Sequence, residues 1–459
     1  MVSIGFLYFF LPVFMALYAL AGQKYRLAVF LLAGALVVGW SSPWGLIPIG
    51  VSILSGWLSA YISTKKSRRA AAFVLTVTVL LNAGSVIALS YSRFFSAGLI
   101  AQISGRDISF PSFGFIGTGV CALHSISYSV DVFTGKYERD ESFLRTACYI
   151  GFFPCFVCGP ILRYDKLKED FLHPIISYDR LAEGIRTLVY GYAEKLVLAA
   201  PLMEIWQRLS AEKTNELSFV SCWIAVWSFA GSLFFDFKAY CDIAKGLGLM
   251  AGFSMPENFN APFSAGGFNE FIKRFCTTLY DWCRDYIYKP ICPHDDRESI
   301  HLPAMLCAVT GGFLWLGLCG KYFIWTLFFL LILTVEYISR KLLAKTNIVL
   351  RAIIMNVMFT GGLPLLMIGN TNDAMSFIGR MFSFSGLPGD VFATYVIRSY
   401  AVLFLVSIFF AFAPAKLIKT SFNQMSPNIL RIVQPVVQTI LLLVATAYLS
   451  VSPVDGFMF

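Results

Sequence analysis

Charged side chains gather on one stretch of an otherwise apolar chain. Residues 268–288, FNEFIKRFCTTLYDWCRDYIY, read as a polar helix, and an apolar run that contains Trp315 and Leu316 follows. The side chains of the polar helix that could bind or position a substrate are Lys273, Arg274, Trp282, Arg284 and Asp285. Because a charge within membrane sequence is costly, such a cluster indicates a functional or water-filled interior.

The composition indicates that the chain is embedded in a membrane. Hydrophobic residues make up 57% of the chain and charged residues only 14%, whereas soluble proteins contain roughly 25% charged residues. An all-α, polytopic membrane protein is therefore predicted. The net charge of +9 is interpreted through the placement of basic loops, and no nucleic-acid partner is expected.

Apolar runs predict about 11–13 membrane segments, since a helix needs about 20 apolar residues to cross the hydrocarbon core. The segments are 2–20, 27–43, 46–62, 70–93, 113–133, 146–162, 184–204, 218–253, 302–319, 321–338, 350–369, 390–413 and 433–452. Segment 218–253 is long enough for one tilted helix or two short ones. One domain, 1–459, is predicted, with N-terminal spans in 1–110, a core in 111–320 and C-terminal spans in 321–459.

The basic loops predict the orientation of the chain. Lys24 and Arg26 lie two spans before the basic residues of 65–69, so the two loops fall on the same side. Since Lys and Arg are enriched in cytoplasmic loops, the N-terminus is predicted to be extracytoplasmic. The first segment has neither a basic start nor a small-residue cleavage site, and it is predicted to be a spanning helix rather than a signal peptide.

One predicted segment is broken. Residues 146–162 lie between two charged stretches and are interrupted by Pro154 and by Gly159–Pro160. Proline removes a backbone donor and disfavours helix in the residue before it. Broken helices at membrane depth persist only when they are buried in protein or line a cavity. A re-entrant segment is therefore predicted here.

Three further polar regions accompany the polar helix. They are HSISYSVDVFTG at 124–135, FPCFVCGPILRY at 153–164, and DFKAYCDIAKGLG at 236–248 with PENFNAPF at 256–263. Together with WCRDYIY, these stretches and their spacing resemble the membrane-bound O-acyltransferase (MBOAT) family over essentially the whole chain. The resemblance is to the bacterial branch that contains the alginate O-acetylases and the teichoic-acid D-alanyl transferases.

The resemblance implies a function and its partners. An acyl group, acetyl-like, would pass from a cytoplasmic thioester to a hydroxyl on an extracytoplasmic polysaccharide or carrier, and the two substrates would meet in a central tunnel. The donor would be acyl-CoA or an acyl-carrier phosphopantetheine, with no bound cofactor and no metal. Expected partners are membrane lipids and either a secreted SGNH-type hydrolase or acyltransferase or an acyl carrier protein. The protein would lie in the bacterial cytoplasmic membrane.

The sequence departs from the family at two positions. The family's catalytic histidine stands in a Leu-Trp-His-Gly stretch, where this chain has Leu314–Gly317 with Leu316 at the histidine position. The second family histidine corresponds to Cys276. Leucine cannot accept a proton, so the alternative reading is a catalytically inactive homologue that binds a thioester, lipid or partner protein. A channel or transporter ranks last, because no inverted repeat is visible.

Two side chains are candidates to replace the missing imidazoles. His124 begins a polar stripe and could serve as the base, although a structural histidine is the simpler interpretation. Cys276 lies beside Lys273 and Arg274, which would lower its pKa and favour a nucleophile, although a packed thiol is simpler. The remaining residues expected to line the tunnel are Arg163, Asp242 and Asn258. The charges of 281–285 are expected to pair within their helix or with Arg163 across the bundle.

Overall fold

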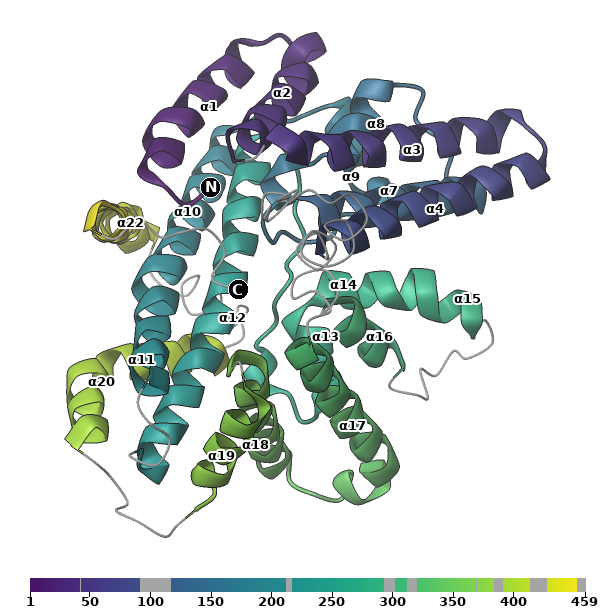
Figure 1. Cartoon of the computed structure of the whole chain (residues 1–459). Coiled ribbons are helices and arrows are strands. Elements are labelled where there is room, and N and C mark those ends of the chain that lie inside the picture. The colour runs from purple at the N-terminus through teal and green to yellow at the C-terminus, as the bar shows by residue number, and fades with distance from the viewer. Residues whose placement is uncertain are drawn as a thin grey trace, which may run out of the picture.

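The computed structural model describes residues 1–41, 43–90, 117–211, 217–292, 302–311, 320–368, 370–383, 391–412 and 427–451. Within these ranges all regular structure is helical (Figure 1). Eight helices of the described part are long and apolar enough to cross a membrane. They are α2 (Gln23–Ser41), α3 (Leu46–Lys65), α4 (Arg68–Ser90), α12 (Phe219–Met250), α17 (Gly320–Leu343), α18 (Ile348–Met367), α20 (Val391–Phe412) and α22 (Pro427–Val451). The predicted all-α, polytopic fold is confirmed.

Helix α12 is the central element of the fold. Its 32 residues extend about 48 Å at 1.5 Å per residue, so segment 218–253 forms one helix rather than two. Its C-terminal half, with Tyr240 and Leu247, packs into a cluster with the N-terminal helices. Its N-terminal half, with Phe229 and Phe234, packs into a second cluster with the C-terminal helices. Figure 1 shows α12 running through the middle of the molecule between these two groups of helices.

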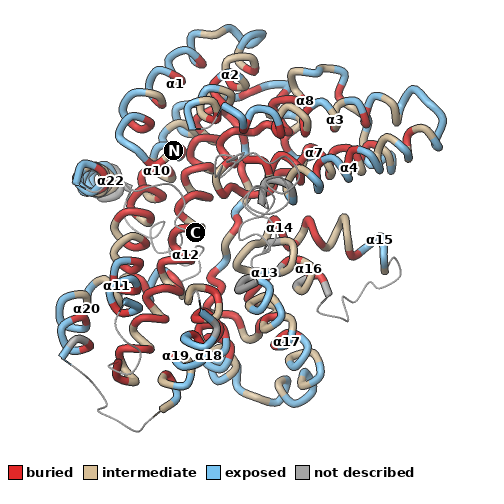
Figure 2. Tube along the Cα trace, in the orientation of Figure 1, coloured by how far each residue is buried: buried red, intermediate tan, exposed pale blue. Residues whose placement is uncertain are grey.

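The outer helices present apolar side chains outward. Leu36 of α2, Phe73 of α4 and Val402 of α20 are each about two-thirds exposed or more. Figure 2 shows the same contrast, with buried residues concentrated along α12 and near the centre and exposed ones along the periphery. Lipid tails are as apolar as these side chains, so burying them against protein gains no hydrophobic free energy in a membrane. The outward-facing apolar side chains therefore fit a molecule surrounded by lipid acyl chains.

Helix α12 packs closely against a neighbouring helical segment, which consists of α10 (Tyr178–Ala193), a π-helical turn η5 (Glu194–Ala199) and α11 (Ala200–Ala211). Glycines let the backbones approach: a Cβ at Gly184 would lie 2.8 Å from the Gly246 carbonyl oxygen, and one at Gly246 2.7 Å from that of Gly184. Small residues at membrane-helix interfaces allow this contact. On the same interface Lys195 and Asp236 form an ion pair in which both side chains are fully buried.

The predicted break at 146–162 is present. After α7 (Thr118–Phe133), helix α8 (Phe143–Ile150) ends at Gly151, and the chain makes a short turn at Phe153–Cys155 before α9 (Tyr164–Leu172) begins. From 146 to 162 every residue except Val157 is buried. This burial within protein is the condition under which irregular backbone is tolerated in a membrane protein.

The polar helix predicted at 268–288 is also divided. It consists of α13 (Phe268–Phe275), α14 (Thr277–Cys283) and a π-helical turn η8 (Arg284–Tyr288), followed by α15 (Lys289–Ile291). The backbone leaves the helical region at Cys276, with φ −144° and ψ 68°. The remaining described helices are α1 (Leu11–Leu20), α16 (Leu302–Gly311) and α19 (Thr371–Met381), with short turns η1 (Phe6–Phe10), η2 (Pro43–Gly45) and η7 (Pro262–Ser264).

One buried carboxylate, that of Asp140, anchors the loop before α8. Its oxygens accept hydrogen bonds from the Ser142 backbone N–H at 2.7 Å and from the Arg145 guanidinium at 2.7–3.0 Å, and the Tyr164 hydroxyl also donates to it. Burial alone would raise the pKa of Asp140, but the hydrogen bonds from Arg145 and Tyr164 hold it below its usual range. The folded loop therefore favours the ionised carboxylate.

Substitution Asp140→Asn should lower the free energy of unfolding by about 2–4 kcal/mol at pH 7, because it leaves the Arg145 charge without its partner. Since the folded pKa is depressed, the wild-type advantage is present above the unfolded pKa of about 3.9 and is lost as the pH falls through the folded value. Thermal unfolding in detergent between pH 3 and pH 7 measures both effects. The exposed neighbour provides the control, Glu141→Gln, and equal melting temperatures for the two variants at pH 7 would contradict the assignment.

Candidate functional site

The centre of the candidate site is a buried, non-helical strip of backbone, residues 158–163, which we call the central segment. The Leu162 N–H donates to His124 Nε2 at 2.9 Å, and the Leu162 carbonyl accepts from the Tyr149 hydroxyl at 3.0 Å. The His124 ring is fully buried and stacks on Tyr149 with centroids 5.1 Å apart. Because a backbone N–H only donates, Nε2 is the unprotonated nitrogen of a neutral ring. To act as a base through Nε2, His124 would have to give up the Leu162 hydrogen bond.

A second set of hydrogen bonds links the central segment to α14. The Ile161 N–H donates to Thr278 Oγ1 at 2.9 Å, and Thr278 Oγ1 donates to Asn258 Oδ1 at 2.8 Å. Asn258 Oδ1 also accepts from the Thr278 backbone N–H at 3.1 Å. The Asn258 amide Nδ2 faces the sulfur atoms of Cys241 at 3.3 Å and Cys276 at 3.7 Å. Asn258 thus connects the central segment to the position of the second family histidine.

The surroundings of Cys276 favour the simpler interpretation, a packed thiol, over an activated nucleophile. Burial raises the pKa of the Cys276 thiol to about 12, so the sulfur stays protonated at neutral pH. The two neighbouring cations contact other groups rather than the Cys276 sulfur. The Lys273 ammonium lies 5.6 Å from the centre of the Tyr280 ring, and the Arg274 guanidinium donates to Ser264 Oγ at 2.9 Å. Arg274 is also paired with Glu270 of its own helix, so both cations have partners other than the sulfur.

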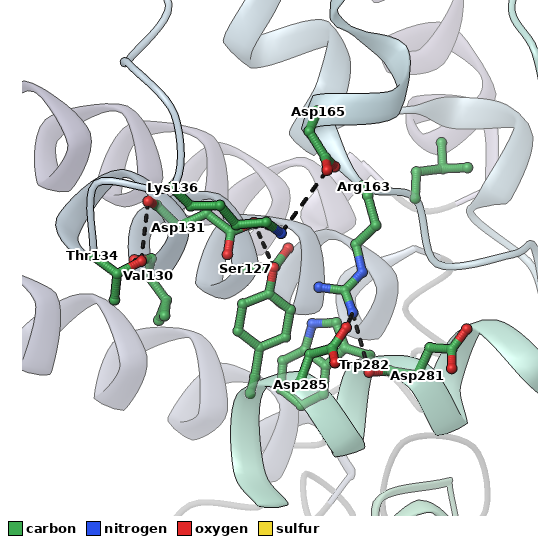
Figure 3. Close-up of polar contacts among 12 residues, drawn as sticks. Ser127, Val130, Asp131, Thr134, Lys136, Arg163, Asp165, Asp281, Trp282 and Asp285 are labelled. Carbon is green, nitrogen blue, oxygen red and sulfur yellow. Dashed lines mark hydrogen bonds and ion pairs between the residues drawn. The ribbon is translucent and has the colours of Figure 1, made fainter. Parts of the chain in front are cut away.

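A charged cluster closes the other end of the central segment (Figure 3). Arg163 Nη2 donates to Asp285 Oδ2 at 2.9 Å and to the Asp281 carbonyl at 3.1 Å. The Arg163 guanidinium also lies 4.4 Å over the Tyr286 ring, and the Tyr286 hydroxyl donates to Asp131 Oδ2 at 2.6 Å. The expected pairing of Arg163 with the charges of 281–285 is confirmed, and it joins α7, the central segment and η8.

Neighbouring residues complete this cluster. Asp285 also binds Lys289 at 3.0 Å and Arg284 at 3.2 Å. Burial would raise the pKa of Asp285, but these cations hold it below its usual range. The Trp282 indole N–H donates to the Leu123 carbonyl at 3.2 Å, which fixes α14 against α7.

Other predicted site residues lie apart from these groups. Asp242 is on α12, where it pairs with Lys238 at 2.6 Å, and Lys238 also binds Glu194 of η5. Trp315 and Leu316 fall outside the described residues. Among the residues that the structure describes, no three His, Cys, Asp or Glu side chains are grouped as a metal site would need.

Tyr286 and two residues that hold the central segment were not singled out in the sequence. Thr278 and Tyr149 both bond the backbone of the central segment. The only available signal was indirect: a broken, buried stretch must find hydrogen-bond partners within the protein. This rule predicts that the buried backbone groups have hydrogen-bond partners, but it does not predict which helices supply them.

Comparison with known proteins identifies the scaffold. The model of the membrane-bound O-acyltransferase family matches residues 4–370. The chain belongs to this family. This MBOAT protein is 30% identical over 336 residues to the probable alginate O-acetylase AlgI of Pseudomonas aeruginosa, covering 70% of the chain and 62% of that protein.

Two further relatives share shorter regions with this MBOAT protein. It is 31% identical over 189 residues to the peptidoglycan O-acetyltransferase of Helicobacter pylori, which covers 40% of the chain and 36% of that protein. It is 25% identical over 231 residues to the teichoic acid D-alanyltransferase of Bacillus subtilis, which covers 48% of the chain and 58% of that protein. The predicted family is confirmed, and the matches span less than two thirds of each of these three relatives.

Substitution His124→Leu should lower the free energy of unfolding by about 2–3 kcal/mol, because it leaves the buried Leu162 N–H without an acceptor. His124→Gln supplies an amide oxygen instead and should recover part of that loss. Urea unfolding in detergent, followed by circular dichroism, measures the difference. If the Leu and Gln variants are equally stable, His124 does not hold the central segment.

Proposed function

We propose that this MBOAT protein transfers an acyl group, acetyl-like, from a cytoplasmic thioester to a hydroxyl on an extracytoplasmic polysaccharide or carrier. The observation that carries the proposal is the hydrogen-bonded polar core around the central segment. Polar and charged groups inside a membrane protein are costly and mark functional pathways. The relatives named above as acetylases and acetyltransferases act on polymers of the cell envelope, which suggests the class of acceptor.

Acyl transfer from a thioester requires few catalytic groups from the protein. The donor is already activated, so the site must supply a base for the acceptor hydroxyl, donors for the developing oxyanion, and exclusion of water. The packed region around Asn258 and Thr278 excludes water. The base is what the chain lacks at the family's position, where Leu316 stands. General-base assistance contributes roughly 10²–10⁴-fold, so slow transfer is expected from positioning alone.

The arrangement of the loops supports arrival of the donor from the cytoplasm at the Arg163 cluster. The α3–α4 loop and the α7–α8 loop lie together, since the Arg68 guanidinium is 5.8 Å from the Phe133 ring and that of Arg139 is 5.1 Å from the Tyr61 ring. Basic loops of this kind face the cytoplasm. The Arg163 cluster is at the same end of α7, so a thioester reaching it would come from that side, with the N-terminus extracytoplasmic.

The proposal extends to partners and location. The protein would lie in the bacterial cytoplasmic membrane and receive its acyl group from acyl-CoA or from an acyl carrier protein. On the far side, a secreted SGNH-type hydrolase or acyltransferase would take the acyl group onward to the polymer, with the two substrates meeting in a central tunnel.

Specific observations favour a second candidate, a catalytically inactive homologue that binds a thioester, lipid or partner protein. The lone pair of His124 Nε2 is already engaged, and burial keeps the Cys276 thiol protonated. With Leu316 at the family position, neither candidate substitute is free to take the proton of an acceptor hydroxyl. The scaffold would then retain binding without fast chemistry.

Restoring the missing base separates the two candidates. Leu316→His should raise acyl transfer by about 10²-fold or more over wild type, measured with purified protein in liposomes, radiolabelled acetyl-CoA and an oligosaccharide acceptor. Leu316→Gln is the matched control and should stay at the slow wild-type rate.

Two other outcomes of this experiment also distinguish an active acyltransferase from an inactive homologue. If Leu316→His shows no transfer while acetyl-CoA still binds, the inactive homologue is favoured. Fast wild-type transfer that survives both His124→Ala and Cys276→Ala would contradict the inactive homologue and both substitute residues.

A further inference from the structure

One nitrogen of the Arg163 guanidinium has no hydrogen-bond acceptor among the described residues. Nη2 makes the contacts to Asp285 and Asp281, whereas Nη1 is buried and has no hydrogen-bond partner in the described part of the chain. A buried donor without an acceptor costs about 1–3 kcal/mol, so such an atom in a polar site needs an explanation. In Figure 3 the guanidinium lies between Asp285 on one side and the α7 residues Ser127 and Asp131 on the other.

We call the charged cluster of Arg163, Asp285, Asp131, Lys136 and Asp165 the Arg163 cluster. The exposed fraction of its side chains falls toward the central segment. Lys136 and Asp165 at its edge are 47% and 40% exposed, and Asp285 is 28% exposed. Arg163 is 11% exposed, and Asn258 beyond it is 6% exposed. A ligand that reached Asn258 from this side would therefore pass Arg163.

Tyr286 covers Arg163 in the structure. Its ring packs on the guanidinium, and its hydroxyl is bonded to Asp131 on the facing helix α7. Among the described residues the Tyr286 hydroxyl has one hydrogen-bond partner, Asp131, and the ring also packs against Trp282 with centroids 5.3 Å apart. Rotation of Tyr286 away from Asp131 would uncover Arg163. We call this Tyr286–Asp131 contact the latch.

The local charges indicate what Arg163 would bind. Asp285 is shared by Arg163, Arg284 and Lys289. With Asp281 on Arg284 and with Asp131 and Asp165 on Lys136, the carboxylates in and beside this cluster balance the cations. An acceptor oxygen of a neutral group, rather than a free anion, suits a cation that is already paired. The pantetheine arm, common to coenzyme A and acyl carriers, is thin and carries amide carbonyls along its length.

We propose that Arg163 Nη1 binds a carbonyl oxygen of the pantetheine arm of the thioester donor, and that the Tyr286–Asp131 latch must open for this contact to form. The inference rests on the proposed function, since it assumes a thioester donor. It assigns to Arg163 donor binding in addition to its pairing with Asp285.

Two variants should change donor binding in opposite directions. Arg163→Lys keeps the charge for Asp285 but removes the second donor end of the fork, and it should weaken binding of coenzyme A about 10-fold or more. Tyr286→Phe removes only the latch hydrogen bond, so it should tighten binding because less of the affinity is lost to opening. A purely structural role for both residues would weaken binding in both variants. Titration calorimetry of the full-length protein in detergent measures the dissociation constants.

Matched controls isolate the Arg163 effect. Arg139→Lys makes the same change at the same end of α7, outside the cluster, and should leave coenzyme A binding unchanged. Melting temperatures of all variants report whether they fold. The probe 3′,5′-ADP carries the nucleotide part without the arm, and its binding should not respond to Arg163→Lys. A response as large as that of coenzyme A would overturn the assignment to the arm.

A further probe, 4′-phosphopantetheine, distinguishes the source of the donor. Affinity equal to that of coenzyme A points to an acyl carrier, and much weaker affinity points to acyl-CoA, whereas the Arg163→Lys loss is expected for both probes. If wild type binds coenzyme A and Arg163→Lys binds it equally well, the inference fails while the proposed function stands. If wild type binds neither probe, the thioester donor itself is contradicted.

Discussion

Irregular backbone buried inside a membrane protein is the constraint on which this structure depends. The central segment at 158–163 forms no helix, and local backbone hydrogen bonds reach only its ends, from the Gly159 N–H to the Cys155 carbonyl and from the Lys166 N–H to the Arg163 carbonyl. The groups between them need partners from elsewhere in the protein. Side chains from α7, α8, α12 and α14 supply the partners: His124, Tyr149, Cys241 and Thr278. Four elements are thereby fixed around one strip of backbone, and the polar core of the protein is explained first as support.

This support changes how the chemistry of the core is judged. A buried histidine and a cysteine beside two cations look catalytic in the sequence, yet the ring of His124 is occupied by a backbone N–H and the sulfur of Cys276 is shielded from the neighbouring charges. The charged end of the segment differs, because there a buried donor of Arg163 is left over. The side chains around Ile161 and Leu162 therefore support the backbone, whereas Arg163 at the charged end of the central segment has a donor left for a ligand.

Sequence reasoning succeeded where a general rule forces the outcome. The helical architecture follows from apolar run length, the break near 154–160 from proline and glycine, and the pairing of Arg163 with Asp285 from the cost of an isolated buried charge. The alternative of an activated Cys276 took adjacency in sequence for adjacency in space, whereas Lys273 lies over Tyr280 and Arg274 binds Ser264. Thr278 was invisible because nothing in a local pattern tells which hydroxyl will meet a backbone group 117 residues away. Asp242 lies on the side of α12 that meets η5, and no periodicity distinguished that side.

The ion pair of Lys195 and Asp236 has a consequence for how the chain enters the bilayer during synthesis. The two residues lie on different helical segments that are both buried against each other in the finished protein. Until both segments are in place, each presents a lone charge to lipid, and a charged residue at the centre of an inserting helix costs roughly 2.5–3.5 kcal/mol. The segment with Lys195 leaves the ribosome first and must wait for α12. The two helices are therefore expected to leave the translocon as a pair, with their association preceding release into lipid.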